Sequence, residues 1–169
     1  VLSTQNGVPW WYFEHETGEL AGLRLESVDP GGVIAASIPA KSVVGSLVYF
    51  ATDLAGPGVV RHIEGNRISL GEPDGTRSDR IKAIAEAFIK AGLRAPVTTR
   101  LRSEMFVKLL GNAAFNPISA LTRATLVKMA QDRDVRALVT EIMTEVSAVA
   151  TRLGITLPVS IEQRIAGAE

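Results

Sequence analysis

The segment from Ser103 to Thr122 constrains this chain more than any other, because it is an apolar run interrupted by one polar stripe. An α-helix turns by about 100° per residue, so Lys108, Asn112 and Asn116 fall on one line of its surface. Ser119 extends that line by another turn. Most of the remaining positions are apolar or glycine, which predicts a long helix that is buried on most of its sides.

Two interpretations of this stripe are open at the level of the residues. A polar stripe that faces water is the common case for a helix at a protein surface. Such stripes are normally built from good helix formers, however, and asparagine is a poor one. The alternative is a polar cleft, in which partial burial lowers the pKa of Lys108 and two amides supply hydrogen bonds. A cleft of this kind suits a small oxygen-rich anion.

Two further residues of the segment bear on its backbone. Gly111 has no side chain, so a ligand or another backbone can approach the helix closely there. Pro117 lacks an N–H group, which predicts a kink at that point. Both features are compatible with a helix that shapes a binding site.

The first part of the chain carries the signals of β-structure. Branched and aromatic residues are concentrated at the first expected strand, and Gly65-Asn66 is typical of a two-residue hairpin turn between two later strands. The Gly- and Pro-containing run from Ala55 to Gly58 predicts another turn. The strands are predicted at residues 43–50, 59–64, 67–70 and 95–98.

The second part of the chain is predicted to be helical. Ser78 is a suitable N-cap for the first predicted helix, and Gly92 is a suitable residue to end it. Strands followed by helices are typical of an α+β fold. The helices are predicted at residues 78–92, 100–122, 132–154 and from 158 onward. In the third, a stripe expected to pack in the core comprises Val135, Leu138, Val139, Ile142, Val146, Val149 and Leu153.

The composition argues against several classes of site. Lys plus Arg and Asp plus Glu number 18 each, so the net charge is zero and no nucleic-acid surface is expected. Cysteine is absent, and neither His15 nor His62 lies near a carboxylate cluster with the spacing of metal ligands, so no metal is predicted. No apolar run has the length of a membrane span, so no membrane partner is expected.

Five stretches of the chain, taken together, resemble the ketopantoate reductase (2-dehydropantoate 2-reductase) family in order and spacing. The most specific element is Lys-x3-Asn-x3-Asn-Pro, which begins at Lys108. The Gln-Asn-Gly loop alone is a weak signal, because Asn-Gly is also a common turn. The matching stretches are Thr4–Val8, Gly56–His62, Ser69–Glu72, Lys108–Asn112 and Asn116–Thr122.

The resemblance implies an N-terminal Rossmann domain followed by a helical domain like that of 6-phosphogluconate dehydrogenase-type reductases. Residues 1–98 are then the second half of an NADP-binding Rossmann-like α/β domain with antiparallel strands. Residues 99–169 are the first helices of the substrate and dimerisation domain, truncated. The family's glycine-rich phosphate loop has no counterpart in this sequence. We therefore expect a fragment that is not catalytically competent by itself.

The same resemblance implies an activity and roles for individual residues. The family reduces 2-dehydropantoate to pantoate with NADPH, on the cytoplasmic route to pantothenate and coenzyme A. The lysine matching Lys108 is the general acid, the asparagine matching Asn112 hydrogen-bonds the substrate, and the one matching Asn116 shapes the pocket. Gln5, Asn6 and Gly7 match the loop on the cofactor side, near the nicotinamide.

Other functions stay open beside this one. The Lys/Asn stripe also suits reduction of another small 2-keto acid. The apolar stripe at residues 135–153 suits a non-catalytic helical interaction module, and a second copy of the chain is a candidate partner in a homodimer. Glu72 is interpreted as a structural hydrogen-bond acceptor beside a turn.

Overall fold

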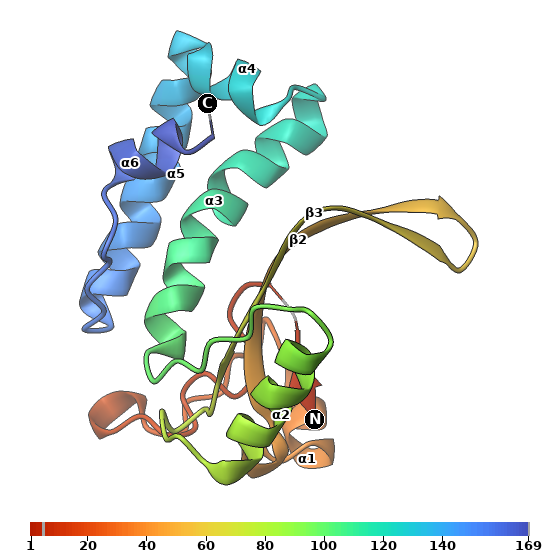
Figure 1. Ribbon diagram of the computed structural model, residues 1–169. Coiled ribbons are helices and arrows are strands. Elements are labelled where there is room, and N and C mark those ends of the chain that lie inside the picture. Colours follow the sequence, from red (N-terminus) through yellow and green to blue (C-terminus); the bar gives the residue numbers. More distant parts are fainter. Residues whose placement is uncertain (5, 169) are drawn as a thin grey trace. The chain divides into compact units, whose positions relative to one another are not determined.

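The computed structural model describes residues 1–4 and 6–168, which belong to two compact units (Figure 1). The first unit is Val1–Leu101 and the second is Arg102–Glu169. The sequence placed the change of domain between residues 98 and 99. The assignment of these parts to a Rossmann half and a substrate domain stays a prediction. Gln5, expected on the cofactor side, lies outside the described residues.

A mixed sheet of three strands forms the centre of the first unit, in the order β1-β2-β3. The strands are β1 (Leu2–Ser3), β2 (Val44–Gly56) and β3 (Val59–Gly71). β1 runs parallel to β2, and β2 runs antiparallel to β3. With the helices described below, the chain has the mixed α+β fold that the sequence predicts.

The predicted strand at residues 95–98 exists only as an extended segment beside β3. Isolated parallel bridges pair Arg67 with Arg94 and Leu70 with Val97. The amide of Leu70 donates to the carbonyl of Pro96 at 2.9 Å. Too few pairs form consecutively to make a strand, although the segment extends the sheet in the expected place.

The predicted hairpin turn at Gly65-Asn66 is wrong. The single turn between β2 and β3 lies at Pro57-Gly58, where Gly58 has a φ of 72°. Gly65 and Asn66 instead stand opposite Phe50 in a bulge of β3, between the Tyr49–Arg67 and Ala51–Glu64 pairs. Gly65 has a φ of 76° there. Hairpins and bulges both use the left-handed glycine conformation, so the dipeptide did not distinguish them.

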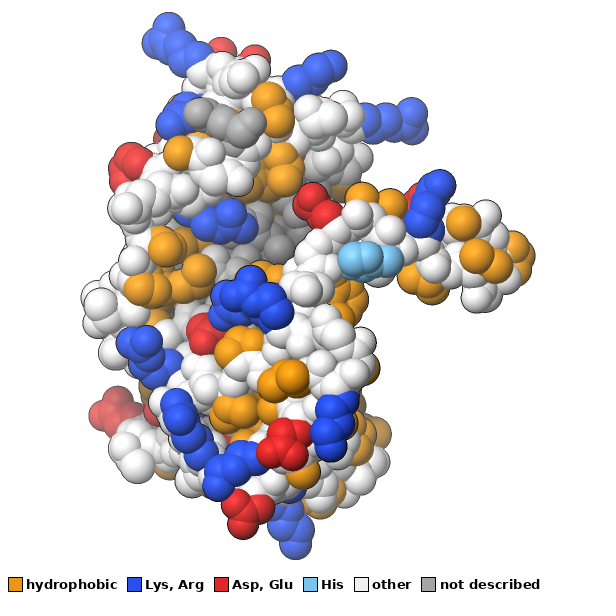
Figure 2. All heavy atoms as spheres, in the orientation of Figure 1, with side chains coloured by type: hydrophobic (Ala, Val, Ile, Leu, Met, Phe, Trp, Pro, Cys, Tyr) orange, Lys and Arg blue, Asp and Glu red, His pale blue; other side chains and the backbone are white. Residues whose placement is uncertain are grey.

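The two halves of this hairpin differ in burial. Its inner half packs on α2 (Asp79–Lys90), whereas residues 51–64 of the outer half are mostly exposed. Figure 2 shows hydrophobic side chains along this outer part. Ser78 accepts the Ile81 amide at 3.2 Å and caps α2, as predicted. The buried cluster of this unit comprises Val44, Ile68, Leu70, Ile81, Ala85 and Ala95.

Short helices connect β1 to β2. The Asp29 carboxylate accepts the amides of Ile34 and Ala35, in the first turn of the longest of them, at 2.8 and 2.9 Å. Helices of three to five residues carry too little periodicity to be recognised from sequence. They are η1 (Gly18–Leu20), η2 (Pro30–Gly32), α1 (Val33–Ser37) and η3 (Ala40–Ser42).

The second unit is built from α3 and three later helices. The expected helices at 100–122 and 132–154 are confirmed, whereas α4 was not predicted. The last helix starts after Ser160, which forms a capping box with Gln163, rather than at residue 158. The bounds are α3 (Leu101–Thr122), α4 (Leu126–Gln131), α5 (Arg133–Arg152) and α6 (Ile161–Ala166).

The apolar stripe predicted on α5 is only partly buried in the core of the second unit. Val139 is buried as expected, but Leu138 and Val149 are 47% and 50% exposed. Met143 and Ala150 are buried instead. The core cluster comprises Leu110, Ala114, Phe115, Ile118, Met129, Ala130, Val139, Met143 and Ile165.

Within the described residues, the helices lack the length and apolarity needed to cross a membrane. The same residues contain no group of three His, Asp or Glu side chains placed to hold a metal ion.

Candidate functional site

The polar stripe lies along α3 at the border between its buried and exposed sides. Lys108 and Asn112 are half-buried, and Asn116 is exposed. The opposite side of the helix contributes Leu110 and Ala114 to the core. The stripe is therefore partly withdrawn from water at its beginning and open to water further along.

Lys108 is affected by this partial burial. Desolvation by burial lowers the pKa of its ammonium group below the ordinary value of 10.5. Loss of water disfavours the charged form of a lysine. The proton of Lys108 is consequently given up more readily than that of an exposed lysine.

The last part of the stripe has a structural role. The Ser119 hydroxyl donates to the Ala124 carbonyl at 2.8 Å, and the Thr122 hydroxyl donates to the Ile118 carbonyl at 2.7 Å. These bonds satisfy backbone groups where α3 ends and the chain turns toward α4. Ser119 therefore serves the end of α3, and the predicted site residues of the stripe are Lys108, Asn112 and Asn116.

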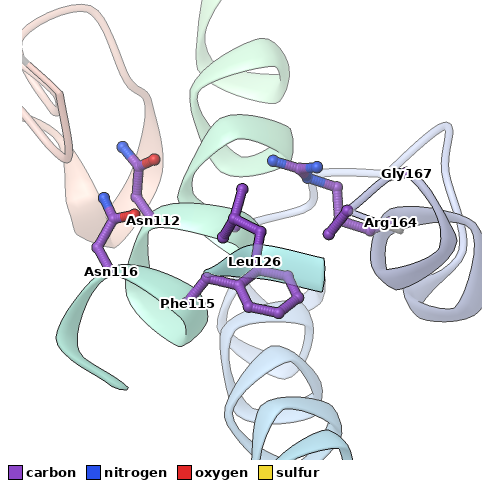
Figure 3. A pocket seen from close by; sticks show the side chains of 8 residues that line it. Asn112, Phe115, Asn116, Leu126, Arg164 and Gly167 are labelled. Atoms are coloured by element: carbon purple, nitrogen blue, oxygen red, sulfur yellow. The ribbon is translucent and has the colours of Figure 1, made fainter. Parts of the chain in front are cut away.

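A pocket of about 150 Å³ opens beside this part of α3, inside the second unit (Figure 3). Asn112 and Asn116 both line it, so the pocket brings two of the predicted site residues together. Lys108 precedes Asn112 by one helical turn on the same line. The other lining residues are Gly111 and Phe115 from α3, Leu126 from α4, and Arg164, Gly167 and Ala168 from α6 and the residues after it.

Arg164 is the functional candidate that sequence reasoning missed. It lies in α6 and is half-buried, with its guanidinium against α3 at Gly111. A Cβ atom at Gly111 would overlap Nη2 of Arg164. The close approach predicted at Gly111 is therefore made by a side chain of this chain. No local motif joins residues so far apart in sequence, so the pairing had no sequence signal.

The residues expected on the cofactor side belong to the first unit. Asn6 is exposed and Gly7 has a φ of 84°, and both lie a few residues after the carboxyl end of β1. Because β1 runs parallel to β2, this loop occupies the kind of edge at which α/β sheets bind dinucleotides. A side chain at Gly7 would meet no atom within 4 Å, so the loop is open.

Glu72 has the structural role that the sequence indicates. It is only 3% exposed and pairs with Arg80, whose Nε donates to Oε1 at 2.8 Å. Arg80 also donates to the carbonyls of Lys41 and Val43 at 2.7 and 3.0 Å. The hydrogen bond from Arg80 is the main reason that the pKa of Glu72 lies below its ordinary value.

Comparisons with known proteins relate this chain to the ketopantoate reductases. The domain family described as "Ketopantoate reductase PanE/ApbA C terminal" matches residues 100–168. A 2-dehydropantoate 2-reductase of Mesorhizobium japonicum is 51% identical, over 99% of this chain and 52% of the relative. One from Nostoc sp. is 29% identical, over 77% of this chain and 42% of the relative. The chain spans about half the length of the curated relatives it matches.

Solved structures give the same result. A Ralstonia solanacearum protein assigned to the ketopantoate reductases has a TM-score of 0.94 and 40% identity, over 99% of this chain and 52% of that one. The 2-dehydropantoate 2-reductase of Methylococcus capsulatus has a TM-score of 0.72 and 31% identity, over 83% of this chain and 48% of that one. The chain therefore belongs to the ketopantoate reductase family, with residues 100–168 forming the part that the family's C-terminal domain covers.

Proposed function

We propose that the complete protein carrying this chain is an NADPH-dependent 2-dehydropantoate 2-reductase, with Lys108 as its general acid. The observation that carries the proposal is the half-buried Lys108, whose pKa is lowered by desolvation, one turn before Asn112 on α3. The 51% identity to a curated 2-dehydropantoate 2-reductase supports the choice of reaction.

The chemistry requires a hydride, a proton and a site for developing negative charge. When bound, the reduced nicotinamide supplies the hydride to the keto carbon. Negative charge then grows on the keto oxygen, where the Lys108 ammonium stabilises it and donates the proton. The ketone becomes a secondary alcohol, and neutral Lys108 takes up a proton from water. A lowered pKa favours this transfer, because the lysine gives up its proton more readily.

The two asparagines orient the substrate in this proposal. The amide of Asn112 donates a hydrogen bond to a substrate oxygen one turn from Lys108. Asn116 shapes the more open end of the pocket, where it is exposed. Both side chains are fixed to one helix, so their spacing from Lys108 is preserved when the substrate binds.

The cofactor side is proposed to involve Gln5, Asn6 and Gly7. The position of Asn6 and Gly7 after the carboxyl end of β1 supports a role near the nicotinamide. The choice of NADPH, the cytoplasmic location and a second copy of the chain as partner rest on the family resemblance. The expectation that the present chain alone is inactive also stays a prediction.

The test is NADPH oxidation by the complete gene product with 2-dehydropantoate. We expect Lys108→Ala to lower kcat/KM by about 10²- to 10⁴-fold, the usual contribution of a general acid. The matched control is Lys128→Ala, which removes an exposed lysine of α4 from the same unit and should leave the rate unchanged.

Two results would contradict the proposal. If the protein reduces other 2-keto acids but not 2-dehydropantoate, the proposed substrate is wrong and the proposed class of reaction is kept. Equal rates for Lys108→Ala and Lys128→Ala would remove Lys108 from the chemistry.

A further inference from the structure

Two glycines stand opposite each other in the sheet of the first unit. Gly45 of β2 pairs with Gly71 of β3, and neither has the positive φ that would require glycine. Glycine in a strand is destabilising, because its backbone loses more freedom on folding and it has no side chain to pack. A close approach by another part of the chain is a common reason to keep one there.

Leu101 and Trp11 fill the space above this pair, and both are buried. A Cβ atom on Gly45 would overlap Cδ2 of Leu101, and it would lie 2.9 Å from Cη2 and Cζ2 of Trp11. A Cβ atom on Gly71 would lie 2.9 Å from Cβ of Leu101. The two glycines therefore form a slot in the sheet, called the glycine slot below, that holds both side chains closely.

The glycine slot lies on the face of the sheet opposite to α2. Side chains alternate between the two faces along a strand. Val44 and Leu70, the neighbours of the two glycines, belong to the cluster that packs on α2, so Gly45 and Gly71 face the other way. Leu47, two residues after Gly45, is buried on this second face. Trp11 and Leu101 are thus part of the cover of the second face.

The glycine slot joins two segments that carry predicted site residues. Trp11 follows the loop that contains Asn6 and Gly7. Leu101 is the first residue of α3 and the last residue of the first unit. Lys108 lies about two turns further along the same helix, so a shift of Leu101 is passed along α3 to the lysine.

We propose that Trp11 and Leu101 are positioning residues for Lys108. Seated together in the glycine slot, they fix the start of α3 against the loop that follows β1. This inference rests on the proposed function and deepens it. A general acid has to stay within hydrogen-bond reach of the keto oxygen, and a misplacement of about 1 Å can lower a rate about 100-fold.

Plain core packing is the alternative, and the glycine pair argues against it. Larger strand residues under smaller side chains would fill the same volume without the cost of two strand glycines. The close approach also extends to the backbone that leads into α3, because a Cβ atom on Gly71 would lie 3.1 Å from the Thr98 carbonyl oxygen. The slot thus brings the start of α3 close to the sheet as well as filling the core.

The test compares two matched deletions in the complete gene product. Leu101→Ala empties the slot, and Leu70→Ala removes the same atoms from the buried cluster on the opposite face. We expect both to lower Tm, whereas Leu101→Ala alone lowers kcat with 2-dehydropantoate, by about 10- to 100-fold. Leu101→Met refills the slot and should keep most of kcat. Full kcat in Leu101→Ala, or an equal loss in both alanine variants, would overturn the inference.

A double variant separates the filling of space from the placement of α3. Gly45→Ala drives a methyl group into Leu101, and adding Leu101→Ala removes that overlap. We expect the double variant to have a higher Tm than Gly45→Ala, while its kcat stays low because the leucine is absent. Recovery of kcat together with Tm would show that the contact only fills the core. Leu101→Val is the milder variant to use if an alanine variant does not fold.

Hydrogen exchange keeps this result apart from a failure of the proposed reaction, because it requires no turnover. Leu101→Ala should raise the exchange rate of the amides in residues 6–13 about tenfold, and Leu70→Ala should change it by less than about threefold. If the wild type does not reduce 2-dehydropantoate, this pattern rejects the proposed reaction and supports the coupling of the loop to α3. Unchanged exchange in Leu101→Ala rejects the inference, whatever the activity.

Discussion

Lys108 owes its altered acidity to its position on α3. Burial lowers its pKa, so the shift depends on how far the side chain is withdrawn from water. A lysine whose pKa is depressed in the folded state favours its neutral form more in the native protein than in the unfolded chain. The residue that helps the proposed reaction therefore opposes folding at neutral pH, where the unfolded chain keeps the ammonium charged.

The lowered pKa of Lys108 predicts how the rate depends on pH. Reduction needs the protonated lysine, so kcat/KM should fall as the pH rises through the folded-state pKa, beginning below the ordinary value of 10.5. Lys108→Arg should lower kcat/KM, because a guanidinium does not give up its proton, and the remaining rate should lack this alkaline limb. The measurement is the pH profile of kcat/KM for both proteins. A limb at the same pH in both would assign it to another group.

The Glu72–Arg80 pair predicts a change in stability. Glu72→Gln removes a buried carboxylate that Arg80 and Ser78 both hydrogen-bond, and should lower the free energy of unfolding by about 1–3 kcal/mol at pH 7. Since the pKa of Glu72 is lowered in the folded state, its contribution is present above the unfolded value of 4.5 and is lost as the pH falls through the folded value.

Urea unfolding at pH 7 and at acid pH tests this prediction. The difference between wild type and Glu72→Gln should shrink as the pH falls below 4.5. Asp79→Asn is the control, because Asp79 is exposed and its pairing with Lys82 should contribute little. A difference that stays constant down to acid pH would show that the charge of Glu72 is not what stabilises the fold.

At the scale of the element, the β2–β3 hairpin depends on glycines in two different settings. Gly58 at the turn and Gly65 in the bulge both have positive φ, at 72° and 76°. A side chain at Gly58 would meet nothing within 4 Å, whereas one at Gly65 would meet the carbonyl oxygen of Tyr49. The same backbone conformation therefore tolerates substitution at one position and resists it at the other.

This contrast predicts unequal costs for two matched substitutions. Gly58→Ala should lower the free energy of unfolding by about 1 kcal/mol, the ordinary cost of a left-handed alanine. Gly65→Ala should cost more, about 2–3 kcal/mol, because the strand must also move away from the new methyl group. Equal midpoints of urea unfolding for the two variants would contradict the crowding seen at Gly65.

Helices with local signals were the elements best predicted from sequence. The helices α2 and α5 carry caps at Ser78 and Asp132, and both have apolar residues at helical spacing. The α4 helix, at Leu126–Gln131, is too short for its periodicity to be recognised. Gly65 shows a different limit of sequence prediction: a turn was expected there, whereas the structure has a bulge within the paired strands β2 and β3.

At the scale of the whole molecule, each unit contains its own hydrophobic cluster. Val44, Leu70 and Ile81 belong to the first, and Leu110 and Val139 belong to the second. The order of strands before helices was visible in the sequence because each part has its own apolar pattern. Which of those apolar residues are covered was less visible, as the exposure of Leu138 on α5 shows.

In the candidate site, too, the features set by one helix were predicted from sequence, and the features set by packing between helices were not. The line of Lys108, Asn112 and Asn116 follows from the geometry of one helix, so spacing alone predicted it. The greater exposure of Asn116 depends on which helices pack beside α3, and spacing carries no information on that. Arg164 joins the pocket only because α6 folds back against α3 at Gly111.

The contact between Gly111 and Arg164 also has an evolutionary consequence. A larger residue at position 111 is harmful only while a long side chain at position 164 fills the same space. The effect of a mutation at either position therefore depends on the residue at the other, which is epistasis with a steric origin. Among relatives that share this packing, the two positions are expected to covary, with glycine at the first wherever arginine is kept at the second.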